Sequence, residues 1–119
     1  KMTVKECYEA FGGNYEDAFS RLRSDDRLLK FLNKATEDGS FKLLTDSLSS
    51  HNLEEAFRAV HTMKGICLNL SITSLGNSSQ ILTEALRNRE QYGDDLIPLY
   101  ENVKKDYEDF VLSVKKMQE

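Results

Sequence analysis

Several kinds of residue and segment are scarce in this chain of 119 residues. It contains no tryptophan and only one proline, and it has no run of about 18 apolar residues that could cross a membrane. The N-terminus also lacks the apolar core of a secretory signal peptide. We therefore expect one cytoplasmic domain, residues 1–119, with no membrane partner.

The chain also lacks a net positive charge, and this argues against another class of partner. The formal net charge is −4, although 30% of the residues are charged. Nucleic-acid-binding proteins present basic faces, because the phosphate backbone that they contact is negative. We do not expect DNA or RNA as a partner.

Cysteine is limited to two residues that show no pattern of metal ligation. Cys7 and Cys67 lie 60 positions apart, and neither has a second ligand at the spacing that zinc sites use. Two cysteines of this kind in a reducing compartment are typical of small buried apolar side chains. The sequence therefore predicts two buried free thiols.

The common catalytic motifs are missing too. A di-iron bundle needs Glu three residues before His, but Leu48 and Arg58 stand before His51 and His61. No pair of histidines has the i, i+4 spacing of a zinc-protease helix, and there is neither a glycine-rich phosphate loop nor a Gly-x-Ser-x-Gly elbow. We expect no metal site, no cofactor and no independent enzymatic machinery.

What the chain does have is apolar residues at helical spacing along most of its length. A capping box of Thr3 and Glu6 predicts a short helix over 3–10, which Gly12 and Gly13 end. Asn14 predicts the start of a second short helix. A third apolar pattern covers 26–49, and we expect it to break near Gly39.

Three further helices are predicted in the second half of the chain. Asn52 and Glu55 indicate the start of a helix over 53–70. A short turn then leads to a helix over 74–90, with Thr73 or Ser74 as its cap. After the capping candidate Asp94, apolar residues alternate at steps of four and three from position 96 to 117. The pattern predicts an all-α protein: a monomeric antiparallel four-helix bundle over 25–118, with a helical cap over 2–24.

The helix over 53–70 carries two residues that do not suit a purely structural role. Its apolar stripe consists of Ala56, Val60, Met63, Cys67 and Leu70. His61 lies beside this stripe, at the margin of the solvated face. Gly65 stands in mid-helix, where it costs roughly 1 kcal/mol relative to alanine.

The neighbours of His61 favour a chemical role for its ring. Imidazole has an unperturbed pKa of about 6.5, so the ring is largely neutral at cytosolic pH. A nitrogen of the neutral ring can attack phosphorus. Lys64, three residues on, places a cation where it could steady phosphoryl oxygens. Gly65 removes a side chain that would crowd an approaching partner, whereas Phe57 and Leu68 flank the ring with apolar surface.

The segment His61-Thr62-Met63-Lys64-Gly65 resembles the HxxKG motif of histidine-containing phosphotransfer (HPt) domains. The resemblance implies a phosphorelay carrier that exchanges phosphoryl groups with response-regulator receiver domains and with hybrid or sensor histidine kinases. In that family the Mg²⁺ belongs to the partner receiver domain. The implied roles are phosphoacceptor for His61, support of the phosphoryl group for Lys64 and secondarily Arg58, and docking surface for Gly65, Phe57 and Leu68.

The chain departs from the family pattern in two respects. Many members have small residues after the glycine, but Ile66, Cys67 and Leu68 follow here. Many also have a glutamine on the next helix near the histidine, and an ungapped count of 22 positions from His61 reaches Thr83. Either Thr83 or Gln80, one turn earlier, could orient the ring.

Two functions other than a phosphorelay carrier are alternatives for such a helix. The helix pair of a sensor kinase usually has an acidic residue directly after the histidine, whereas Thr62 is found here. The second alternative is a helical protein-binding adaptor in which His61 is incidental. It predicts that no phosphoryl group ever reaches the chain.

Overall fold

Helices alone make up the secondary structure of the chain, which a computed structural model describes from Lys1 to Glu119. The predicted all-α class is confirmed. The helices are α1 (Val4–Phe11), α2 (Tyr15–Leu22), α3 (Asp25–Glu37), α4 (Ser40–Ser49), α5 (Leu53–Leu70), α6 (Thr73–Leu86) and α7 (Leu96–Met117).

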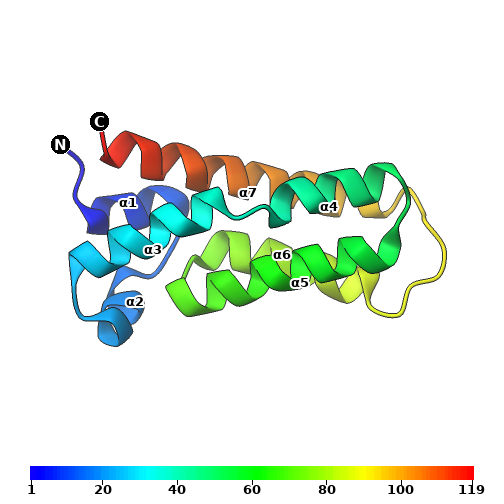
Figure 1. Cartoon of the computed structure of the whole chain (residues 1–119), viewed down its shortest axis with the longest axis horizontal. Coiled ribbons are helices and arrows are strands. Elements are labelled where there is room, and N and C mark those ends of the chain that lie inside the picture. The colour runs from blue at the N-terminus through cyan, green and yellow to red at the C-terminus, as the bar shows by residue number, and fades with distance from the viewer.

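The helices pack side by side into an elongated body of 45 × 26 × 19 Å (Figure 1). The helix α5 packs against α4 on one side and α6 on the other, and α6 in turn packs against α7. Figure 1 shows α3 and α4 following one another along the length of α7, with α1 and α2 gathered at one end. The helix α5 therefore has α4 and α6 as its main neighbours, and its outer face stays exposed.

The helix starts and breaks follow local sequence signals for most of the chain. The capping box of Thr3 and Glu6 is formed, and the side chains of Asn14 and Asn52 cap α2 and α5 as predicted. The expected break near Gly39 is also present, because Asp38 has an extended backbone with ψ of 136°. The Asp38 carboxylate accepts the Ser40 N–H at 2.9 Å, which starts α4.

Tertiary contacts replace the expected cap at the start of α6. Neither Thr73 nor Ser74 caps this helix, so that prediction was wrong; the N-cap is Ile72, which has no capping side chain. The Ser74 N–H instead donates to the Gly12 carbonyl at 2.9 Å. The Gly12 carbonyl, at the end of α1, thus bonds to an N–H in the first turn of α6 that a local capping side chain would otherwise satisfy.

The predicted helix over 74–90 was too long, and Asp94 is not the cap of α7. The helix α6 ends at Leu86, and Asn88 is left-handed with φ of 52°. The Arg89 guanidinium donates to both carboxylate oxygens of Asp95, at 2.6 and 2.9 Å, and to the Gln91 carbonyl at 2.7 Å. This clamp holds the connection as a loop and occupies Asp95, the actual N-cap residue, which makes no capping hydrogen bond.

The predicted core of α5 is confirmed. Its apolar stripe, Ala56, Val60, Met63, Cys67 and Leu70, is buried throughout. Both cysteines are buried and free, as expected, and burial raises the pKa of the Cys67 thiol to about 12. Because the stripe fixes the rotation of α5, His61 must face outward. No helix combines the length and the apolar composition that a membrane crossing requires.

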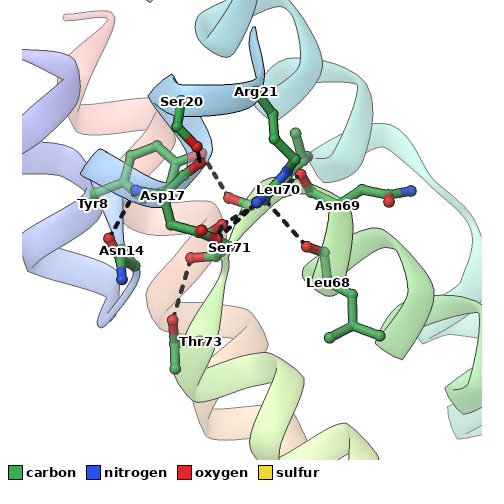
Figure 2. A network of polar contacts seen from close by, with 10 residues as sticks. All are labelled: Tyr8, Asn14, Asp17, Ser20, Arg21, Leu68, Asn69, Leu70, Ser71 and Thr73. Atoms are coloured by element: carbon green, nitrogen blue, oxygen red, sulfur yellow. Dashed lines mark hydrogen bonds and ion pairs between the residues drawn. The ribbon is translucent and has the colours of Figure 1, made fainter.

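A polar network fastens α2 to the C-terminal end of α5 (Figure 2). The Arg21 guanidinium donates to the Asn69 carbonyl at 2.9 Å and to the Ser71 hydroxyl at 2.7 Å. The Ser71 hydroxyl donates in turn to Asp17, and the buried Tyr8 hydroxyl donates to the Leu70 carbonyl at 2.8 Å. These bonds satisfy carbonyl groups that the last turn of a helix leaves without partners.

We expect Arg21→Ala to lower the free energy of unfolding by about 1–2 kcal/mol, because charge-assisted bonds to the end of α5 are lost from a partly exposed side chain. Urea denaturation followed by circular dichroism measures this change. Arg27→Ala is the matched control, since Arg27 is exposed on α3 and its side chain makes no ion pair. Equal stability of the two variants would contradict a clamping role for Arg21.

Candidate functional site

His61 lies on the exposed outer face of α5, in the middle of the helix. Its ring stacks on the ring of Phe57, one turn earlier, with centroids 5.6 Å apart and planes 9° apart. Neither ring nitrogen is engaged in a hydrogen bond to another residue of the chain. The structure therefore presents an imidazole that is supported on one face by Phe57 and whose nitrogens are both unengaged.

Lys64 and Arg58, the two cations predicted near His61, have different surroundings. The Arg58 guanidinium pairs with the carboxylates of Glu54, at 3.0 Å, and Glu55, at 3.3 Å. Lys64 is half-buried one turn beyond His61 and forms no ion pair within 4 Å. Lys64 is thus the cation whose charge remains available to a group bound at the ring.

Packing does not require the glycine at position 65. A Cβ atom added to Gly65 would meet no side chain or distant backbone atom within 4 Å. The residue is also helical, with no positive φ that would favour glycine. The space above this turn of α5 is open, so the absence of a side chain leaves the surface beside His61 flat.

Apolar side chains border this flat surface at both ends of the site. Leu68, the next turn along, is 67% exposed. Phe57 is half-buried against the core, and the Arg87 guanidinium lies over its ring at 5.2 Å. The predicted docking residues Phe57, Gly65 and Leu68 therefore follow one another along the same helix face as His61.

The two candidates for orienting the ring make other contacts. Thr83 is fully buried, and its hydroxyl donates to the Ser79 carbonyl at 2.7 Å. Gln80 is exposed, and its amide donates to Glu84 at 3.4 Å. Neither side chain bonds to His61 in this arrangement.

Glu84 on α6 belongs to the site, although the sequence did not single it out. The Arg87 guanidinium donates to both Glu84 carboxylate oxygens, at 2.9 and 3.2 Å. These bonds lower the pKa of the Glu84 carboxyl, and the positive charge of Lys64 lowers it further. Glu84 is therefore within electrostatic reach of Lys64. No local sequence pattern pointed to Glu84, because its place depends on how α6 is rotated against α5.

The other histidine lies apart from these residues. His51 precedes α5, has a left-handed backbone with φ of 58°, and stacks on Tyr92 of the α6–α7 loop with centroids 3.7 Å apart. It is exposed, as expected for a loop residue. Three or more His, Cys, Asp or Glu side chains do not come together anywhere as a potential metal site.

Comparison of the chain with protein-family models, with curated proteins and with solved structures gave no match. The relation of residues 61–65 to the HPt motif therefore stays a prediction, and the geometry around His61 is what bears on function.

Proposed function

We propose that this chain is a phosphorelay carrier in which His61 accepts and passes on a phosphoryl group. The observation that carries the proposal is the combination at one helix face of an unengaged imidazole, a lysine without an ion pair, and open space over a mid-helix glycine. A structural histidine would need none of these neighbours. Together they suit a ring that must meet a large partner and hold an anionic group.

The proposed reaction is a direct exchange between two proteins. The unprotonated nitrogen of the His61 ring attacks the phosphorus of an aspartyl phosphate on a receiver domain, and a P–N bond forms. The P–O bond to the aspartate breaks, and the carboxylate leaves on the receiver, while the second ring nitrogen keeps its proton. Lys64 offsets the charge of the phosphoryl oxygens. The receiver supplies Mg²⁺, and the reverse reaction delivers the group to a second aspartate.

The proposed architecture serves this exchange. We assign α3 and α4, which together make one broken helix, and α5, α6 and α7 to an antiparallel four-helix bundle, and we assign α1 and α2 to a cap that closes one end of it. The pairing of α5 with α4 and α6 supports this assignment. The carrier acts as a cytoplasmic monomer, since one exposed helix face is sufficient for one docked receiver at a time.

The test of the proposal is transfer from a receiver domain carrying radiolabelled aspartyl phosphate. Label should appear on this chain in an acid-labile, alkali-stable form, which is characteristic of phosphohistidine. A helical adaptor, the alternative function, would bind partners without acquiring label and would bind them equally well after His61→Ala. Label that resists acid would indicate a hydroxyl acceptor and would contradict the proposal.

We expect Lys64→Ala to slow transfer to His61 on the order of tenfold, because one charge-assisted contact to the phosphoryl oxygens is lost. Arg58→Ala should change the rate much less, since Glu54 and Glu55 already neutralise that guanidinium. Quenched-flow measurement of label on the two variants gives the comparison. If Arg58→Ala has the larger effect, the assignment of the supporting cation is wrong.

A further inference from the structure

A cleft of about 280 Å³, lined mostly by polar residues, opens beside Lys64, where α2, α5 and α6 meet. Lys64 and Leu68 line it from α5, Asn77 lines it from α6, and Asn14 lines it from the cap of α2. The cleft therefore begins at Lys64, one helical turn from His61. Any partner that covers His61 and Lys64 will also come close to the start of α2.

Two asparagine side chains in this cleft have hydrogen-bonding groups that the chain does not use. Asn77 is exposed, and its amide has no hydrogen bond to another residue. The Asn14 side-chain oxygen accepts the Asp17 N–H at 3.0 Å, which leaves its NH₂ group free. An asparagine amide offers two donors and an acceptor, the same groups that a peptide backbone requires.

The helix α2 holds Asn14 in a fixed place relative to α5. The Asn14 N–H donates to the Ser71 carbonyl at 2.9 Å, and the Arg21–Asp17–Ser71 network fastens the same helix (Figure 2). A partner would therefore meet Asn14 already in place and would lose little ordering entropy in binding it. The unused amide groups of Asn14 and Asn77, in the same cleft as Lys64, are therefore suited to selecting a partner.

We propose that this cleft is a second contact region for the receiver domain that exchanges phosphoryl groups with His61. The cleft binds a loop of the receiver, whose peptide groups form hydrogen bonds with the side-chain amides of Asn14 and Asn77. These contacts discriminate between receiver domains, all of which present an aspartate to His61. This inference rests on the proposed phosphorelay function. Its occupant is a polar protein loop, since the lining near Lys64 is rich in amides and hydroxyls.

The double variant Asn14→Ser/Asn77→Ser tests the inference without disturbing the fold. Serine caps a helix about as well as asparagine, so α2 keeps its start. The probe is the receiver domain of the source genome that labels the wild-type chain fastest. We expect receiver-dependent transfer to fall on the order of tenfold, the effect of losing two hydrogen bonds. Labelling of His61 by phosphoramidate, which does not fill the cleft, should stay unchanged.

Asn102→Ser is the matched control, because Asn102 is exposed on α7, outside the cleft. It should transfer at the wild-type rate. Wild-type transfer by the double variant, or an equal loss in the control, would overturn the docking role of the cleft while leaving the carrier function intact. Failure of both receivers and phosphoramidate to label the wild-type chain would instead overturn the proposed function, and the inference with it.

Discussion

His61→Gln will acquire no phosphoryl label from a receiver domain under conditions that label the wild-type chain. Glutamine keeps a polar side chain of similar reach on the exposed face of α5, but its amide nitrogen has no available lone pair with which to attack phosphorus. The loss should be complete within detection, because the structure offers no second histidine nearby: His51 lies before α5, stacked on Tyr92.

The fold should tolerate this substitution. His61 is exposed and makes no hydrogen bond, so the change removes little beyond its stacking on Phe57. We expect the free energy of unfolding to change by less than about 1 kcal/mol. His51→Gln is the matched control and should label normally. Label that persists in His61→Gln, or that disappears in His51→Gln, would refute the assignment of the acceptor.

Local signals explain why most of the fold could be predicted from the sequence. The start of α5 is determined by Asn52, and its rotation by an apolar stripe of which every member is buried. The break between α3 and α4 follows from Asp38 and Gly39 in the same way. Each of these features depends on residues within about one turn of each other, so no knowledge of the packing was needed.

Tertiary contacts explain where the prediction failed. The end of α6 and the start of α7 depend on Arg89 reaching Asp95, six positions along the chain. The start of α6 depends on Gly12, more than sixty positions away. Neither partner could be inferred from a local capping pattern. The sequence therefore predicted which segments are helical, but it extended α6 too far and assigned the wrong caps to α6 and α7.

The candidate site shows the same difference between what depends on local sequence and what depends on tertiary packing. His61, Lys64 and Gly65 are neighbours on one helix, and their shared face followed from spacing alone. The residue that α6 contributes depends on how α6 is rotated against α5, which a count of positions does not give. That count reached Thr83, which is buried and bonded to Ser79, whereas the residue near His61 and Lys64 is Glu84, one position later.

Gly65→Gln will make the protein more stable and a poorer carrier. Glutamine is a good helix former, and a Cβ at this position meets nothing within 4 Å, so the free energy of unfolding should rise by about 0.5–1 kcal/mol. The melting temperature should rise by about 4 °C. The added side chain would, however, stand on the flat surface where the receiver must approach His61. Displacing the reacting atoms by about 1 Å can cost a hundredfold in rate, and we expect a loss of that order.

Gly39→Gln is the control for this result, since a Cβ at Gly39 also meets nothing within 4 Å but lies at the junction of α3 and α4. It should transfer at the wild-type rate. Phosphoramidate is small enough to reach the ring beside a glutamine, so it should label Gly65→Gln normally. Stability is measured by thermal unfolding and transfer by label from the receiver. A Gly65→Gln variant that exchanges with the receiver as fast as wild type would show that the glycine does not serve docking, whereas loss of phosphoramidate labelling would place its effect on the ring itself.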